Sequence, residues 1–578
     1  MSSDFNIPRI YFVNDDKSLL RLFGYCFNSR EYNTNSGSAD KFIEDLSKIN
    51  LSFKIFFSVL KSILKYYSCV SAFVEPIYID RIHRDSYYSY YSENHLEVSR
   101  YCKRILFFEG QVTDGLDDNA KKLQSVFLGS MVIRPLKTGC IGRTLLSPRV
   151  FWGSKNLTSY IRISKYKINF LGMELWVKAF PFLTQDSIVT TCAETSIMIM
   201  LDYYSNQYND YRFALPSDIS KCVQRFSNSR VLPSHGLSYG IMSKVLFEFG
   251  LFTHFHRFSQ NARSKKYKNY LYYYVESGMP VCLNLSKGNI GHAVVCIGHK
   301  EISTSEMTNS LTCYSSDHNS TYFASTAAGC NSLIIMDDNL PPYYEYSFLS
   351  NEINPFELYV VRADKQNGCE NNKMMIDCFI APLHKRMHMI ASRAEEVVLE
   401  LIANDFTNPC LYFRNRKEDL KNWGTDKDNP LFFRLFLASS RHYRNNRIKN
   451  SSSVMTAAYR HYCLGVPLPQ FIWVCELYTK ISYDEKMAIG EIVIDATASP
   501  KLDLFDCILM INYTYDNAYF ARGLDGTILD PEGLQGKGNE PEAVLLIKRY
   551  KGEGFKLKSY MSNLSNSFES KDLFDDCI

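Results

Sequence analysis

The 578-residue sequence predicts a multidomain protein of the α/β (α+β) class. Its length exceeds what a single hydrophobic core usually supports. Apolar residues make up 46% of the chain and charged residues 22%, which is a normal balance for globular domains. Helical periodicities and strand-like runs occur together along most of the sequence. We expect three regions, which cover residues 1–165, 166–362 and 363–578.

The first region mixes helices with short strands. Helical patterns cover residues 39–67 and 117–127, and "FLGSMVIRPL" (127–136) reads as a strand. The segment "MVIRPLKTGCIGR" (131–143) has the glycines of a turn, but it lacks the Lys-Ser/Thr ending of a phosphate-binding loop. The sequence assigns no role to this region.

The second region contains "TQDSIVTTCAETSIMIMLDYY", residues 184–204. Thr191 and Glu194 have the spacing of a capping box, so we expect a helix whose first residue is Cys192. The residues that follow are apolar on nearly all sides, which predicts a helix buried between other elements. Further helical patterns follow in the same region, at residues 215–226, 235–251 and 263–281.

Strand patterns dominate the rest of the second region. The stretch "GMPVCLNLSKGNIGHAVVCIGH" (278–299) predicts two strands joined by a glycine-containing turn. Residues 301–332 include 13 Ser or Thr, and we expect an inserted polar loop on the surface. The run "NSLIIMDDN" (331–339) predicts a buried strand that ends in acidic residues.

The third region begins with the polar segment "ADKQNGCENNK" (363–373), which is typical of a linker. A helix is expected near residues 383–403. Strands are expected at 471–478, 490–499 and 507–515. We find no internal repeat.

Cys192 combines a reactive residue type with an activating position. A thiol at a helix N-terminus meets the positive end of the helix dipole and free amide groups, which favour the thiolate. A thiolate nucleophile also needs a base and a group that orients that base. His292 begins one predicted strand, and Asp337 and Asp338 end the next. Antiparallel pairing brings such positions together. Upstream, Gln185 is suited to donate its amide to an oxyanion, with the Cys192 backbone N–H as second donor.

This order of Gln, Cys at a helix start, Gly-His on a strand and Asp after the next strand resembles the papain-like cysteine peptidases. The closest group is the bacterial one typified by the leader-processing peptidase domains of peptide exporters, over residues of about 180–362. The resemblance implies a nucleophile helix packed on an antiparallel sheet, a protein or peptide substrate, and no cofactor. It implies the following roles: Cys192 is the nucleophile, His292 the general base and acid, Asp337 the orienting acid, and Gln185 the oxyanion donor.

Some positions depart from the family pattern or leave alternatives. Gln185 lies seven residues before Cys192, where six is usual, so Asp186 competes for the same place. Asp338 is an alternative orienting acid for His292. The expected activity is a peptidase or isopeptidase reaction through a thioester. The same residues also suit transglutaminase-type transfer to an amine, and an inactive papain-like scaffold is the alternative outside enzymes.

Other cysteines and histidines are weaker candidates. Cys296 follows His292 by four residues and reads as a core residue, whereas His299 falls on the opposite face of the strand. His384 and His388 have the spacing of zinc ligands on a helix, but Lys385 stands where a metallopeptidase needs glutamate.

His254 and His256 alternate on a predicted strand without an evident third ligand. We therefore predict no metal site.

Charge and composition limit the partners. The formal net charge of +4 is nearly neutral for this length, so neither nucleic acid nor an acidic membrane is expected as a partner. The basic run "SRHYRNNRIKN" (440–450) is typical of a solvated helix end. No signal peptide and no run of about 18 apolar residues is visible. The cysteines are odd in number and lack CxxC pairs, so we expect a cytoplasmic protein. The oligomeric state is not predicted.

Overall fold

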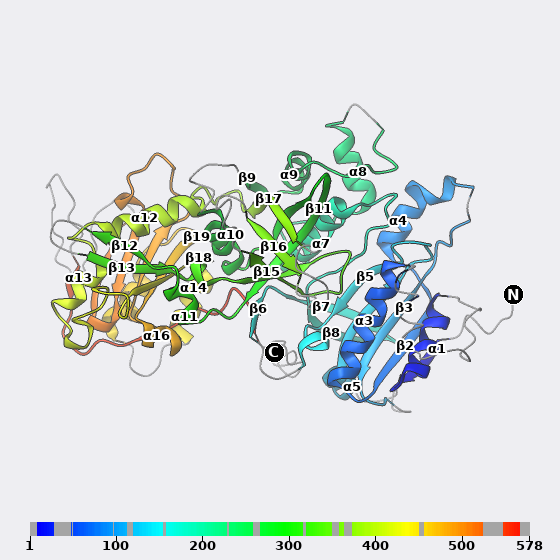
Figure 1. Cartoon of the computed structure of the whole chain (residues 1–578), viewed down its shortest axis with the longest axis horizontal. Coiled ribbons are helices and arrows are strands. Elements are labelled where there is room, and N and C mark those ends of the chain that lie inside the picture. Colours follow the sequence, from blue (N-terminus) through cyan, green and yellow to red (C-terminus); the bar gives the residue numbers. More distant parts are fainter. Residues whose placement is uncertain are drawn as a thin grey trace.

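The chain is described from a computed structural model. The described residues are 8–27, 45, 48, 50–95, 97–112, 120–153, 158–227, 230–257, 266–315, 320–349, 358–362, 373–449, 456–523 and 547–566. Figure 1 shows an elongated molecule in which the N-terminal and C-terminal parts lie at opposite ends of the long axis, with the central part between them. Helices and several sheets are combined throughout, so the α+β class is confirmed.

The N-terminal part contains a five-stranded antiparallel sheet whose strand order follows the sequence. Its strands are β1 (Arg9–Val13), β2 (Val70–Tyr78), β3 (Cys102–Glu109), β4 (Phe127–Ile133) and β5 (Ile141–Leu146). Its helices are α1 (Asp16–Phe27), α3 (Leu51–Tyr66), α4 (Arg81–Ser89), α5 (Ala120–Val126) and α6 (Arg149–Trp152). The predicted strand at 127–136 is confirmed, and so are the described parts of both predicted helices.

Both faces of this sheet are covered. Helices α1 and α3 pack on one face, against alternate residues of β3 such as Ile105 and Phe107. The other face packs against a hairpin of β7 (Ser164–Phe170) and β8 (Met173–Ala179). The predicted boundary at about residue 165 falls inside this hairpin, whose apolar side completes the N-terminal core.

The central part is built on a ring of antiparallel strands. The order β10–β11–β14–β15–β16–β17 closes because β17 also pairs with β10, while β9 extends β17 and β6 extends β11. The strands are β6 (Ser159–Ile161), β9 (Phe252–Arg257), β10 (Val281–Lys287), β11 (Ile290–Lys300), β14 (Ser332–Met336), β15 (Tyr344–Leu349), β16 (Tyr359–Arg362) and β17 (Lys373–Leu383). Strand β17 lies beyond the predicted boundary at 362, so the central region continues to Leu383. The predicted linker at 363–373 lies almost wholly outside the described residues.

Helices cover this ring on two sides. They are α7 (Cys192–Gln207), α8 (Pro216–Gln224), α9 (Tyr239–Glu248) and α10 (Tyr267–Glu276). Helix α7 joins the ring to the core of the N-terminal part, whereas α10 joins it to the core of the C-terminal part. The prediction of a buried helix that begins at Cys192 and packs on an antiparallel sheet is confirmed.

The C-terminal part holds an eight-stranded sheet of order β12–β13–β18–β19–β21–β22–β23–β24. The strands are β12 (Thr312–Ser315), β13 (Ser320–Ser325), β18 (Leu431–Ser439), β19 (Phe471–Tyr478), β21 (Gly490–Asp495), β22 (Ile508–Tyr513), β23 (Ala518–Ala521) and β24 (Lys548–Arg549). A short pair is formed by β20 (Met487–Ala488) and β25 (Leu557–Lys558). The helices are α11 (Thr304–Thr308), α12 (Ala391–Ala403), α13 (Pro409–Arg414), α14 (Ser440–Lys449), α15 (Ala457–Gly465) and α16 (Lys480–Asp484).

The prediction of a polar surface loop at 301–332 was wrong. This segment forms α11, β12 and β13, and β13 pairs in parallel with β18. Phe323 and Ala324 of this segment are buried in the C-terminal core, which its Ser and Thr content concealed. Among the described residues, no helix is both long and apolar enough to cross a membrane.

Candidate active site

Cys192 is the first residue of α7, and its position follows from local hydrogen bonding. The Glu194 carboxylate accepts a hydrogen bond from the Thr191 backbone N–H (3.1 Å) and another from the Thr191 hydroxyl. These contacts end the preceding loop and start the helix. The helix is buried from Ala193 to Tyr204, yet Cys192 itself is only half-buried. The Cys192 sulfur therefore lies at the solvent-accessible N-terminus of a helix that is otherwise buried.

Strand β11 lies directly against this end of the helix. The Ala293 backbone N–H donates to the Cys192 Sγ, with an N···S distance of 3.5 Å. One turn further along the helix, the Ser196 hydroxyl donates to the Ala293 carbonyl oxygen (3.1 Å). Two bonds at one residue fix the thiol beside the start of β11. The amide of Ala293 also supplies a donor that stabilises negative charge on sulfur.

His292, the neighbour of Ala293, brings an imidazole to the thiol. Its Nε2 lies 2.8 Å from Asp337 Oδ1. A carboxylate only accepts hydrogen bonds, so Nε2 carries the hydrogen and Nδ1 is left for the Cys192 thiol, with which the imidazole also interacts. Burial opposes protonation of His292, but Asp337 and the Cys192 contact raise its pKa well above the usual range. The imidazolium form is therefore favoured.

Asp337 is fully buried and held on every side. Its Oδ2 accepts from the Tyr346 hydroxyl (2.5 Å) and from Arg362 Nη2 (3.4 Å), and its Oδ1 also accepts from the Asn339 backbone N–H (2.9 Å). Burial alone raises a carboxyl pKa, but the charge and hydrogen bond of His292, assisted by Arg362, hold the pKa of Asp337 below its usual range. Asp337 is thus a fixed carboxylate behind the imidazole.

Asp338 occupies a different environment from its neighbour. Its Oδ1 lies 3.7 Å from His292 Nε2, and neither carboxyl oxygen finds a hydrogen-bond partner among the described residues. Burial raises the pKa of Asp338 well above its usual range, and the adjacent Asp337 charge adds to this effect. The geometry therefore makes Asp337, rather than Asp338, the carboxylate that contacts the imidazole.

The Gln185 side chain, from the loop before α7, lies next to Asn339, which in turn contacts His292. Its Nε2 donates to Asn339 Oδ1 (3.4 Å), and Asn339 Nδ2 lies 3.3 Å from His292 Nε2. Asp186, its competitor, is buried and accepts from the backbone N–H groups of residues 188, 189 and 190 at 2.8–3.0 Å. Asp186 therefore shapes the loop, while the Gln185 side chain donates one of its two amide hydrogens to Asn339.

The sequence analysis missed Asn339, Tyr346 and Arg362, which contact the catalytic candidates. Asn339 follows the acidic pair directly, and that proximity was a usable signal. Tyr346 and Arg362 face each other on the paired strands β15 and β16. No local pattern marks them, because their role depends on the pairing of these strands with β14.

The ligand atoms of His292, Asp337 and Asp338 lie within 4.8 Å of one another, which is close enough for a metal ion. The Arg362 guanidinium already neutralises Asp337 from the other side. A divalent cation would also have to displace the proton that Nε2 shares with Asp337. We therefore assign these side chains to proton handling.

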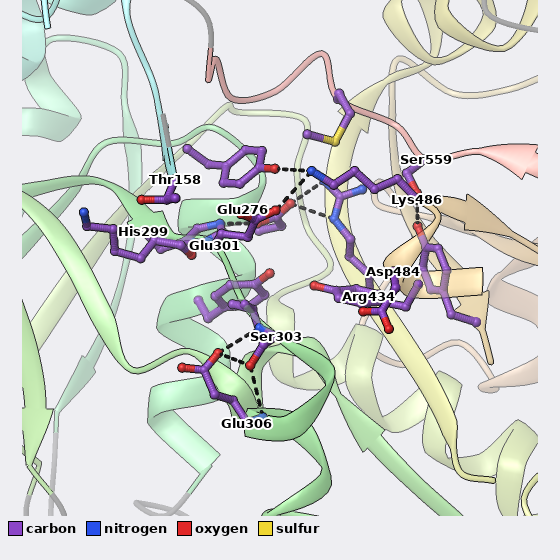
Figure 2. Close-up of a pocket in the computed structure, with 17 residues that line it drawn as sticks. Thr158, Glu276, His299, Glu301, Ser303, Glu306, Arg434, Asp484, Lys486 and Ser559 are labelled. Atoms are coloured by element: carbon purple, nitrogen blue, oxygen red, sulfur yellow. Dashed lines mark hydrogen bonds and ion pairs between the residues drawn. The ribbon is translucent and has the colours of Figure 1, made fainter. Parts of the chain in front are cut away.

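A separate cavity of about 520 Å³ lies between the central and C-terminal parts, and Figure 2 shows it. His299, from the far end of β11, lines it together with Glu276 and Arg434. His299 Nε2 lies 2.6 Å from Glu276 Oε2, and Nδ1 lies 2.6 Å from the Lys300 carbonyl oxygen. Arg434 Nε donates to the other oxygen of Glu276 (2.7 Å). Both ring nitrogens are occupied, so His299 has no free position for a nucleophile.

The other candidates from the sequence fall outside the Cys192 site. Cys296 is buried in the core. His254 and His256 lie on β9 with ring centroids 4.4 Å apart, and the His256 ring stacks on Phe379. His384 and His388 were expected on a helix, which was wrong: they lie in the turn between β17 and α12.

The basic run at 440–450 forms the helix α14, as expected, but it is not wholly solvated. Arg447 is buried and pairs with Glu476 (2.7 Å) and Glu491 (2.6 Å). Glu476 in turn pairs with Arg434 at 2.8 Å, so the ion pairs form one chain that reaches Glu276. The run contributes to the interior of the C-terminal part.

Comparisons with known proteins add no relative. No protein-family model matches this chain, and no curated protein matches it significantly.

Proposed function

We propose that the chain is a cysteine-dependent acyl-transfer enzyme, and that it acts as a peptidase or isopeptidase of the papain-like type on a protein or peptide substrate. The observation that carries the proposal is the position of His292, between a thiol at a helix N-terminus and a buried carboxylate. These three residues supply a nucleophile, a base and an orienting group.

In the acylation step, the Cys192 thiolate attacks the carbonyl carbon of an amide. A carbon–sulfur bond forms, and the negative charge moves to the carbonyl oxygen. The second amide hydrogen of Gln185 and the Cys192 backbone N–H are the donors for this oxyanion. The His292 imidazolium gives its Nδ1 proton to the leaving nitrogen, the carbon–nitrogen bond breaks, and the amine departs.

In the second step, neutral His292 accepts a proton from water as the water attacks the thioester. The carbon–sulfur bond breaks, a carboxylic acid is released, and the thiolate–imidazolium pair is restored. Asp337 keeps the imidazole in the tautomer with hydrogen on Nε2 through both steps. Tyr346 and Arg362 hold Asp337 in place, which gives the base a fixed orientation.

The test is selective modification of Cys192 at neutral pH. Limiting iodoacetamide, followed by peptide mapping, is expected to label Cys192 far faster than Cys313, which is exposed and has no imidazole contact among the described residues. Cys192→Ala and His292→Ala are the controls. If Cys192 is labelled no faster than Cys313, the enzyme proposal fails, and the chain is better described as an inactive scaffold of the same fold.

The second candidate within enzymes is transfer to an amine instead of water. The half-buried setting of Cys192 admits either acceptor. Product analysis of a peptide amide substrate, with and without an added primary amine, separates them. Carboxylic acid as the main product in both reactions supports hydrolysis, whereas a new amide in the presence of the amine supports transfer.

A further inference from the structure

The N-terminal part is joined to both loops that carry the candidate catalytic groups. We propose that strand β5, with the turn before it, positions these two loops, and that Arg134 and Tyr343 are the positioning residues. This inference rests on the proposed function, because the loops hold the oxyanion donor and the orienting acid of that reaction. It gives the N-terminal part a role in catalysis.

The first loop runs from Phe182 to the start of α7 and is attached to β5 as an extra edge segment. Thr144 and Phe182 exchange backbone hydrogen bonds of 2.8 and 3.0 Å. Two residues on, the backbone N–H of Thr184 donates to the Ile141 carbonyl oxygen (3.1 Å), and its hydroxyl donates to the same oxygen (2.7 Å). The chain thus follows β5 up to the residue before Gln185.

Arg134 fixes the point where the loop leaves β5. Arg134 is the residue directly after β4, and it is only 3% exposed. Its Nη2 donates to the Thr184 carbonyl oxygen (2.7 Å) and to the Gly139 carbonyl oxygen. One guanidinium therefore ties the turn before β5 to the residue that precedes Gln185.

The same turn touches the loop through its backbone. Gly139 has φ +60°, and a Cβ built on it would lie 1.9 Å from the Gln185 carbonyl oxygen. Only glycine is compatible with both the backbone angle and the close approach. Beyond Gln185, the three amides that bond to Asp186 fix the rest of the loop. The position of Gln185 relative to β5 is therefore set on both sides.

The second loop follows Asp337 and reaches the opposite end of β5. The Tyr343 hydroxyl donates to the Leu146 carbonyl oxygen (2.8 Å) and accepts from the Phe180 backbone N–H (2.9 Å). The loop itself is closed by a bond from the Leu340 N–H to the Asp337 carbonyl oxygen (3.0 Å). Tyr343 thus connects the loop of Asp337 and Asn339 to the strand that also carries the loop of Gln185.

These contacts make the spacing between oxyanion donor and base a property of the N-terminal sheet. The Cys192–His292 pair depends on α7 and β11 instead, through Ala293 and Ser196. Loss of Arg134 should therefore displace Gln185 while leaving the thiol beside its imidazole. A displacement of about 1 Å in a positioned group typically costs about 100-fold in rate.

The test compares two reactions of Cys192 in the full-length chain. Alkylation by iodoacetamide needs the thiolate but no oxyanion donor. Acetylation by 4-nitrophenyl acetate forms a carbon–sulfur bond, releases 4-nitrophenolate and passes through an oxyanion. We expect Arg134→Met to slow acetylation about 10- to 100-fold and alkylation less than threefold. Arg134→Lys is expected to fall between this variant and the wild type, because a lysine can still donate to one of the two carbonyls.

The matched control is Arg149→Met. Arg149 is also buried in the N-terminal part and donates to the backbone carbonyls of Phe127 (2.9 Å) and Ser125 (3.4 Å), neither of which belongs to either loop. It should lower the melting temperature to a similar degree and leave the ratio of the two rates unchanged. Tyr343→Phe provides a second route if the Arg134 variants do not fold: it should slow both reactions, because it loosens the loop that holds Asp337.

The outcomes separate the two ideas. Equal loss of both rates in Arg134→Met, in proportion to the unfolded fraction, would make Arg134 a purely structural residue and overturn the inference alone. An unchanged ratio in a folded Arg134→Met protein would do the same. A wild-type protein that reacts selectively at Cys192 with neither reagent would overturn the proposed function, and the inference with it.

Discussion

Two histidines at opposite ends of strand β11 show how similar contacts lead to different chemistry. His292 and His299 are seven residues apart, and each has Nε2 within hydrogen-bonding distance of a buried carboxylate, at 2.8 Å for Asp337 and 2.6 Å for Glu276. The difference lies at the other ring nitrogen. In His299 it bonds to the Lys300 carbonyl oxygen, whereas in His292 it is left for the Cys192 thiol.

The surroundings of the two carboxylates, Asp337 and Glu276, also differ. Burial opposes ionisation of Glu276, but Arg434 and His299 hold its pKa well below the usual range, inside a continuous chain of ion pairs. That chain joins the central and C-terminal parts. The proposed catalysis therefore involves the pair at His292, where one ring nitrogen still faces a thiol, whereas the pair at His299 is a structural cross-link.

The largest expected effect comes from removing the imidazole of the His292–Asp337 pair. His292→Ala should reduce the rate of Cys192 alkylation and any peptide hydrolysis on the order of 1,000-fold, because the thiol loses the group that holds its proton. His299→Ala, measured at a temperature where the protein is folded, should stay within about threefold of the wild type. Equal losses in the two variants would remove the distinction drawn between the histidines.

Asp337→Asn is expected to cost on the order of 100-fold in rate at neutral pH, since the imidazole loses its orienting carboxylate. The pKa of His292 is raised chiefly by this carboxylate against the effect of burial. Its removal should lower that pKa, so the alkaline limit of the pH–rate profile should move to lower pH. An alkaline limit that stays in place would show that another group controls the imidazolium.

The second pair should respond through stability. His299→Ala leaves Glu276 buried with fewer partners, and we expect a loss of about 3 kcal/mol in the free energy of unfolding. His292→Ala is expected to cost less, because Asp337 keeps its hydrogen bonds from Tyr346, Arg362 and the Asn339 backbone N–H. Urea denaturation of both variants measures the two values, and a reversed order would contradict the structural role of His299.

Asn339→Ala should lower the hydrolysis rate about 10-fold, with little change in alkylation of Cys192. Asn339 bonds to Gln185 and lies beside His292, so its loss frees the oxyanion donor more than the thiol. The measurement compares two rates at Cys192 in the variant and the wild type: single-turnover acetylation and alkylation by iodoacetamide. A parallel fall in both rates would place Asn339 with the base alone.

The smallest effect is expected at Asp338. Burial raises its pKa, so it behaves as a neutral carboxyl group to higher pH than an ordinary aspartate, and the neutral amide in Asp338→Asn resembles it closely. The rate at neutral pH should change less than about threefold. A loss comparable to that of Asp337→Asn would show that both acids act on His292.

The site was largely accessible from sequence because its signals are local. The capping pattern around Cys192 fixes the start of α7 from four consecutive residues. Apolar runs fix β10, β11 and β14, and antiparallel order is enough to bring His292 next to Asp337. Choosing Asp337 over Asp338 needed the actual direction of each side chain at the strand end.

Strands β13 and β17 were not predicted from the sequence, for a different physical reason. Strand β13 is rich in Ser and Thr, and it is a strand because β18, more than a hundred residues later, offers it an edge. Strand β17 completes the central ring by pairing with β10 across a similar span of chain. Composition carries no information about an edge supplied by distant residues.

By itself, the sequence determined a mixed helix–sheet protein with a thiol at the mouth of a buried helix and a histidine and an acid on adjacent strands. Only the tertiary structure decided which residues hold that acid, and that the N-terminal sheet supports both loops of the site. The physical reason is range: capping and strand periodicity act over a few residues, whereas Arg134, Tyr343, Tyr346 and Arg362 meet their partners only after the sheets have paired and packed.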